Sequence, residues 1–115
     1  MKFNLTRPCD NCPFRSDRPE QRGWLGRERA AEITHAVLRG DKTFTCHKTL
    51  ERPKAEQSMC AGALTLLRGT SRDESPFGNA MVQVAERLGL YDPTTLRDDV
   101  PVFRTAQEME DFHTC

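Results

Sequence analysis

The chain has 115 residues, of which 37% are hydrophobic and 30% charged, so it has room for one small domain and not for two separate cores. Positive and negative side chains are equal in number, which excludes a strongly basic domain. No stretch reaches the roughly 20 apolar residues of a membrane span, and the segment MKFNLTRPCD lacks the apolar core of a signal peptide. We therefore expect a soluble cytoplasmic protein.

The charges are unevenly divided along the chain. Residues 1–72 contain 14 Lys and Arg against 8 Asp and Glu, a net charge of +6, whereas residues 73–115 contain 3 against 9, a net charge of −6. The two halves either attract each other within one domain or face different partners.

The first 25 residues predict an ordered loop region. They contain three prolines, at positions 8, 13 and 19, and no helical period. Residues 26–115 predict a helical body, so that residues 1–115 form one domain. We expect a mainly α fold of about four short helices, with at most a short strand.

The first two predicted helices have clear apolar spacing. Residues 27–39 place Ala30, Ile33 and Val37 on one face, and Gly40 follows as a stop signal. Between the helices, KTFTCHKT favours a short extended segment. Residues 58–68, SMCAGALTLLR, predict a second helix that Ser58 caps and that Gly69 ends.

Two more helices are predicted in the acidic half. The third begins at Ser75–Pro76, where proline suits the first turn, and runs to Gly89. Asp92–Pro93 predicts a short helical turn. Thr105 and Glu108 have the capping-box spacing, which predicts a terminal helix with its apolar side chains turned inward.

Four cysteines are candidate metal ligands. Cys9 and Cys12 form a C-x2-C pair flanked by prolines, a spacing that lets two thiolates reach one ion. Cys46 follows after 33 residues and Cys60 after a further 13. Cys60 falls at the start of a predicted helix, where the helix dipole favours a thiolate. In a reducing compartment, such cysteines indicate metal ligation more than disulfides.

The pattern leaves the metal open between two choices. Structural Zn²⁺ sites usually combine two paired motifs, whereas this chain has one pair and two single cysteines. Four cysteines also suit a [4Fe–4S] cluster, although neither common ferredoxin spacing is present. Zn²⁺ is preferred because structural zinc is the more frequent site, and an iron–sulfur protein that senses oxygen or redox state is the alternative.

The role of His47 also stays open. It is an alternative fourth ligand, a group that supports the ligands, a catalytic base beside a thiolate, or an ordinary histidine. Because neighbouring residues of an extended segment point to opposite faces, Cys46 and His47 are not expected to bind the same ion. The last residue, Cys115, is interpreted as a free thiol, and we do not expect it to form a second metal pair with His113.

Four segments of the sequence, RPCDNCPFR, FTCHKT, CAGAL and AERLGLYDP, occur together in this order. In these segments the chain resembles an uncharacterised family of small cysteine-containing proteins of phages, prophages and actinobacteria, over residues 6–95. The resemblance implies that the four cysteines and His47 form a shared site, in a protein of mobile elements. It implies no particular activity.

These features favour a metal-binding protein that acts as a binding or regulatory module. A protein or a nucleic acid would bind to the basic half, where arginines lie near aromatic side chains: Arg7, Arg15, Arg18, Arg22, Arg27 and Arg29. An enzyme is the less favoured alternative, either with Cys46 and His47 as nucleophile and base or with an open metal site. The chain offers no Gly-rich phosphate loop and no third group to orient His47.

Overall fold

The computed structural model describes residues 2–10, 12–73, 79–97 and 99–114, apart from the side chains of residues 70–73. These ranges contain α1 (Arg27–Leu38), α2 (Ala61–Asp73), α3 (Ala80–Arg87) and α4 (Ala106–Phe112), and four short 3₁₀ turns: η1 (Pro19–Gln21), η2 (His47–Thr49), η3 (Lys54–Glu56) and η4 (Pro93–Thr95). Within them the backbone forms three isolated β-bridges and no strand. The prediction of a small, mainly α fold is confirmed.

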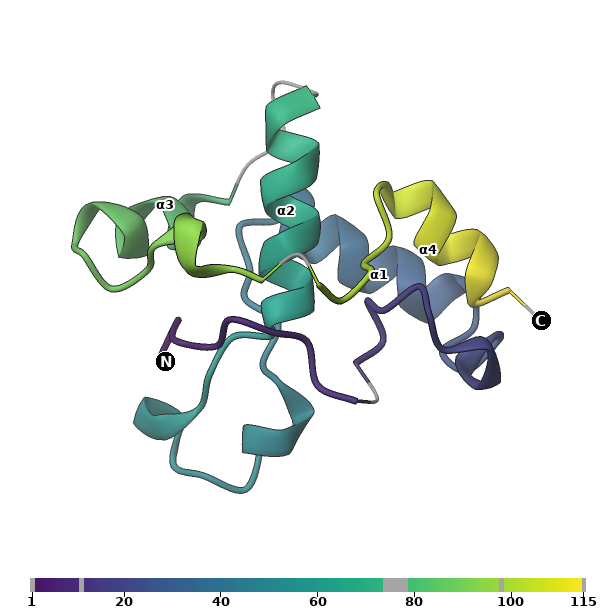
Figure 1. Cartoon of the computed structure of the whole chain (residues 1–115), viewed down its shortest axis with the longest axis horizontal. Coiled ribbons are helices and arrows are strands. Elements are labelled where there is room, and N and C mark those ends of the chain that lie inside the picture. Colours follow the sequence, from purple (N-terminus) through teal and green to yellow (C-terminus); the bar gives the residue numbers. More distant parts are fainter. Residues whose placement is uncertain (1, 11, 74–78, 98, 115) are drawn as a thin grey trace.

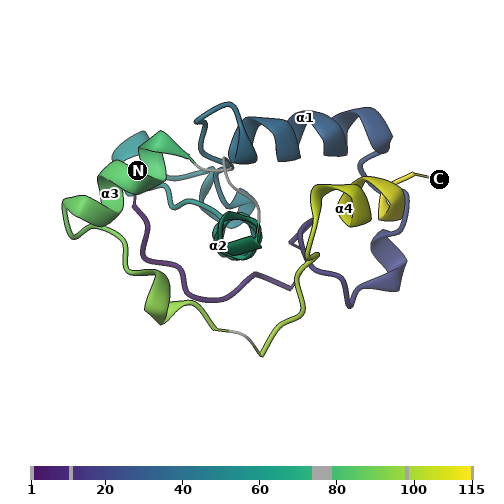
Figure 2. The ribbon, with the colours of Figure 1, turned by 90° about the horizontal axis from the view of Figure 1, so that it is seen from above.

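Helix α2 lies at the centre, and the other elements surround it (Figures 1 and 2). Its first two turns are buried on almost every side, at Ala61, Ala63, Leu64, Leu66 and Leu67. An apolar surface all round a helix requires neighbours on all of its sides. The irregular N-terminal and middle segments supply several of these neighbours.

Three extended segments meet just before α2. Met59 pairs with Lys2 on one side, through its N–H to the Lys2 carbonyl at 2.9 Å. On the other side it forms an antiparallel bridge with Thr45, flanked by bonds from Cys46 N to Ser58 O at 2.8 Å and from Cys60 N to Phe44 O at 2.7 Å. These bonds fix where Cys46 and Cys60 stand relative to each other.

Helices α1 and α3 are joined by one buried asparagine. The Asn79 amide donates to the carbonyls of Val37 at 2.9 Å and Lys42 at 2.7 Å, while its side-chain oxygen accepts from the first N–H groups of α3. Asn79 thereby caps α3 and also supplies a hydrogen-bond donor to a backbone carbonyl in the last turn of α1. Helix α4 packs along α1, with an ion pair between Arg27 and Asp111 at 2.9 Å.

The predicted boundaries of α1, the turn after Asp92 and the cap of α4 agree with the structure. The limits of the second helix are wrong: Ser58 belongs to the extended segment, α2 begins only at Ala61, and Gly69 lies inside it. The bridges of Lys2 and Thr45 hold residues 58–59 extended, which outweighs their local preference for a cap. The expected start of the third helix at Ser75–Pro76 lies outside the described residues.

In the described part of the chain, none of the helices is long and apolar enough to cross a membrane.

Candidate functional site

The four candidate cysteines come together beside the first turn of α2. The sulfurs of Cys12 and Cys60 are 3.3 Å apart, although 48 residues separate them in sequence. The Cys9 side chain contacts those of both Cys12 and Cys46. Cys12, Cys46 and Cys60 are buried, Cys9 is partly exposed, and all four are free thiols. Three segments far apart in the chain thus meet at one cluster.

Backbone N–H groups point at the three buried sulfurs. The Phe14 amide donates to Cys12, the Lys48 amide donates to Cys46, and the amides of Gly62 and Ala63 donate to Cys60. In each case a donor lies two residues after the cysteine. Such bonds stabilise negative charge on sulfur and are the support that metal-bound thiolates usually receive.

The pKa values of Cys12 and Cys60 shift in opposite directions. The hydrogen bond from the Cys12 thiol lowers the pKa of Cys60, and the amides at the start of α2 lower it further. The same bond, together with burial, raises the pKa of Cys12 well above its ordinary range. Burial also raises the pKa of Cys46. Of the thiols of Cys12 and Cys60, that of Cys60 is therefore the more acidic, as expected from its position directly before a helix.

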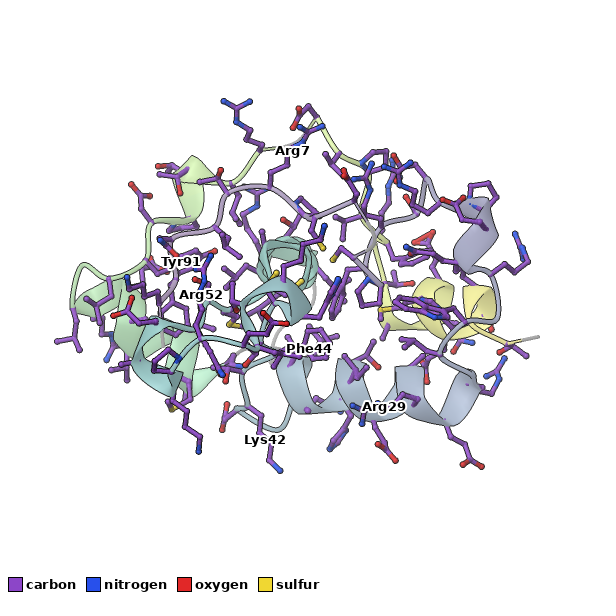
Figure 3. The ribbon with its side chains drawn as sticks, turned by 90° about the horizontal axis from the view of Figure 1, so that it is seen from below. Arg7, Arg29, Lys42, Phe44, Arg52 and Tyr91 are labelled. Atoms are coloured by element: carbon purple, nitrogen blue, oxygen red, sulfur yellow. The ribbon has the colours of Figure 1, made fainter. Side chains whose placement is uncertain are left out.

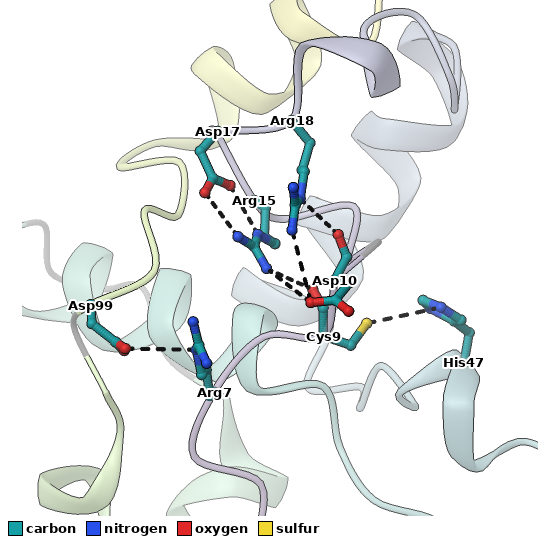
Figure 4. A network of polar contacts seen from close by, with 8 residues as sticks. All are labelled: Arg7, Cys9, Asp10, Arg15, Asp17, Arg18, His47 and Asp99. Carbon is teal, nitrogen blue, oxygen red and sulfur yellow. Dashed lines mark hydrogen bonds and ion pairs between the residues drawn. The ribbon is translucent and has the colours of Figure 1, made fainter.

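His47 lies at the partly exposed edge of the cluster. Its Nε2 atom is 3.9 Å from the sulfur of Cys9 (Figure 4). Cys46 and His47 both lie within reach of Cys9, although they are neighbours in the chain, and whether they would bind the same ion stays a prediction. Both reach Cys9 because the chain turns into η2 directly after Cys46, so the alternation of an extended segment ends there.

A close approach between the N-terminal loop and α2 depends on Gly62. A Cβ atom at this position would stand 2.7 Å from the Cys12 sulfur and 2.7 Å from Cβ of Phe14. Both distances are far below a normal contact, and Phe14 is fully buried. Glycine is thus required where the loop crosses the first turn of α2.

Arg15 anchors the loop from its other side. Its guanidinium donates to both carboxylate oxygens of Asp17, at 2.9 and 2.8 Å, and to the Cys9 carbonyl at 3.3 Å (Figure 4). Arg15 is 6% exposed. The hydrogen bonds from Arg15 lower the pKa of Asp17. This fork of two parallel bonds is a geometry that lysine cannot reproduce.

His113 holds the loop to the end of the chain. It is fully buried, its Nδ1 atom accepts the Leu25 N–H at 3.3 Å, and its protonated Nε2 donates to the Pro13 carbonyl at 3.0 Å. Both ring nitrogens are thereby satisfied in one neutral tautomer. No sequence pattern indicated this role of His113. Cys115, interpreted as a free thiol and not as a metal partner of His113, lies outside the described residues.

The thiols meet in pairs and do not surround one point. Among the residues that the structure describes, no group of three or more His, Cys, Asp or Glu side chains is arranged to hold a metal ion as it stands. Around one tetrahedral ion with zinc–sulfur bonds of about 2.3 Å, neighbouring sulfurs stand about 3.8 Å apart. Cys12 and Cys60, at 3.3 Å, would separate by about 0.5 Å to meet that geometry.

Most of the arginines expected to bind a partner are engaged within the chain. Five of the six take part in ion pairs: Arg7 with Asp99, Arg15 with Asp17, Arg18 with Asp10, Arg27 with Asp111, and Arg29 with Glu32. Arg22 lies over the ring of Phe112. The pairs of Arg7 and Arg27 join the basic half to the acidic half, so part of the charge division is balanced inside the molecule.

The chain belongs to a family of unknown function, DUF6283, whose model matches residues 4–114. It is also similar to glutamate–tRNA ligase 2 of Paracoccus denitrificans (strain Pd 1222), with 37% identity over 67 residues. This match covers 56% of the chain and 14% of the ligase, so the chain corresponds to a small part of that enzyme. No solved structure matches the chain significantly.

The contact at Gly62 predicts opposite effects for two glycine substitutions in α2. Gly62→Ala forces Cβ against Cys12 and Phe14, and we expect it to lower the free energy of unfolding by about 1–3 kcal/mol, the usual cost of overpacking. The matched control is Gly69→Ala, where a Cβ meets nothing within 4 Å, and alanine should raise stability by about 0.5–1 kcal/mol. Urea unfolding of both variants tests this, and equal effects would contradict it.

The contacts of Arg15 predict a loss of stability even when the substituted residue keeps the positive charge. Arg15→Lys removes the fork to Asp17 and the bond to the Cys9 carbonyl, so we expect it to lower the free energy of unfolding by about 2 kcal/mol. Arg29→Lys, in an exposed pair with Glu32, should change it by less than about 0.5 kcal/mol. If thermal or urea unfolding finds no difference between the two variants, Arg15 has no anchoring role.

Proposed function

We propose that the chain is a small zinc-binding module in which Cys9, Cys12, Cys46 and Cys60 hold one structural ion. The observation that supports this best is the meeting of four thiols from three distant segments, three of them with backbone N–H donors already directed at sulfur. A set of four thiolates suits zinc in both charge and ligand type. The separation of Cys12 and Cys60 that an ion requires is small.

The spacing of the sulfurs favours a single ion over an iron–sulfur cluster. A [4Fe–4S] cluster has one iron at each thiolate, so its four cysteine sulfurs stand much farther apart than those around one ion. Here the sulfurs of Cys12 and Cys60 are 3.3 Å apart, and the loop packs directly against α2 at Gly62. A cluster would have to push this contact open. The [4Fe–4S] sensor therefore remains the second candidate.

His47 offers one further donor at the exposed edge of the site. Since Cys9 is the most exposed of the four cysteines and lies 3.9 Å from Nε2 of His47, exchange between these two ligands is the simplest variation of the site. A site of three cysteines and His47 would carry one negative charge less than four thiolates. Binding zinc would add folding free energy to a chain with a small core.

A zinc ion held by four protein ligands suits a protein that acts by binding a partner. Four protein ligands leave no open position for water or substrate, as in structural zinc sites generally. The similar stretch lies in an enzyme whose name links it to tRNA, and this supports RNA as the partner of the present chain. The ligase activity itself is not carried over, because the match covers 14% of that enzyme. A setting in phages or prophages is part of the proposal.

Metal analysis of protein purified without oxygen tests this function. We expect one zinc and no iron per chain, and a strong loss of zinc and of folding in Cys60→Ser, because metal-binding free energy is folding free energy in such a domain. Cys115→Ser is the matched control and should retain zinc. About four irons with equal sulfide would establish the [4Fe–4S] candidate instead. A folded, zinc-replete Cys60→Ser protein would contradict the four-cysteine site.

A further inference from the structure

A loop of residues 47–57 leaves the cysteine cluster at Cys46 and returns to it at Cys60. In Figure 1 it projects at the lower left, away from the helices. The backbone closes its base, since Cys46 N donates to Ser58 O at 2.8 Å. Both ends of the loop are thus held at candidate zinc ligands.

Hydrogen bonds give the loop a defined shape. The Gln57 side chain donates to the carbonyls of Leu50 at 3.2 Å and Arg52 at 3.0 Å. At the base, the Thr49 hydroxyl donates to the Cys46 carbonyl at 2.9 Å and accepts the Ser58 N–H at 3.1 Å. A surface loop whose ends meet and whose backbone is held by its own side chains is of the kind that often carries function.

The cations of this loop differ from the arginines of the N-terminal region. Lys48, Arg52 and Lys54 are exposed, and within the described part of the chain none of them forms an ion pair. Residues 50–56 are exposed without interruption. The acidic Glu56 is paired with Lys2 at 2.9 Å and also attracts Arg52, and Glu51 is the second acidic residue of the loop. Figure 3 views the molecule from the side on which the loop projects, with Arg52 labelled.

We infer that loop 47–57 is the surface that contacts the phosphate backbone of RNA, with Lys48, Arg52 and Lys54 as the phosphate-binding side chains. This inference rests on the proposed zinc module. A four-cysteine zinc site has a net charge of −2, which would repel phosphate near the base of the loop. Lys48 follows His47 directly and offsets part of that charge, whereas Arg52 and Lys54 lie in the loop's exposed stretch.

The zinc site would control the loop by fixing its ends. With the ion bound, Cys46 and Cys60 would stand at a fixed separation, and the ends of the loop that carries the three cations would be fixed as well. Without it, only hydrogen bonds close the base, and ordering the loop would cost free energy at the moment of binding. RNA affinity should therefore depend on zinc as well as on salt.

The test measures anisotropy of fluorescein-labelled tRNA with the zinc-loaded full chain at several salt concentrations. Arg52→Gln/Lys54→Gln removes two phosphate contacts and should lower the slope of log affinity against log salt by about 1.4 to 1.8. The matched control is Arg87→Gln/Arg104→Gln, which removes the same charge from exposed positions elsewhere and should change the slope by much less. Equal slopes for both double variants would overturn the assignment of the loop.

Two further measurements separate failure of this inference from failure of the proposed function. Zinc content is measured on every sample, so loss of the zinc site is seen independently of RNA. If the zinc-replete chain fails to bind tRNA at low salt, the RNA inference is overturned, whereas the proposed zinc module is not. A protein would then be the partner to seek for the loop. We expect removal of zinc by a chelator to weaken tRNA binding at least tenfold. Unchanged binding would overturn the control of the loop by zinc.

Discussion

The packing of the N-terminal loop on the first turn of α2 is the contact on which the rest of the structure depends. At this contact Cys12 lies 3.3 Å from Cys60, and Gly62 provides the room that a side chain would fill. The same turn of α2 supplies the amides that lower the pKa of Cys60. One helix start therefore organises the thiols, stabilises a negative charge among them and sets the position of the loop.

Two buried polar side chains extend this constraint through the molecule. Arg15 holds the Cys9 carbonyl and Asp17, and His113 joins Pro13 to Leu25, so that the loop is fixed both within itself and to the C-terminal region. These contacts explain how a chain with only 37% hydrophobic residues keeps a long irregular segment in place. If zinc binds as proposed, the ion would add a further cross-link to these contacts.

Local patterns predicted that the fold is mainly helical and where several of its helices lie, but not how the segments meet. The apolar spacing of α1 and the caps of Asp92 and Thr105 are local signals, and the structure follows them. The start of α2 depends on bridges to Lys2 and Thr45, which no local pattern reveals. Likewise, the role of His113 depends on Pro13, which lies a hundred residues away in sequence. Gly62, two residues after Cys60, is a signal for close backbone packing, but the sequence does not show which segment packs against it.

X-ray absorption at the metal edge of the anaerobically purified protein tests the central proposal most directly. We expect zinc with four sulfur neighbours at about 2.3 Å, or three sulfurs and one nitrogen if His47 replaces Cys9. In either case one ion would lie where the thiols of Cys12 and Cys60 now touch. An iron edge with iron–iron scattering, or zinc surrounded by oxygen and nitrogen alone, would contradict a single zinc ion held by these cysteines.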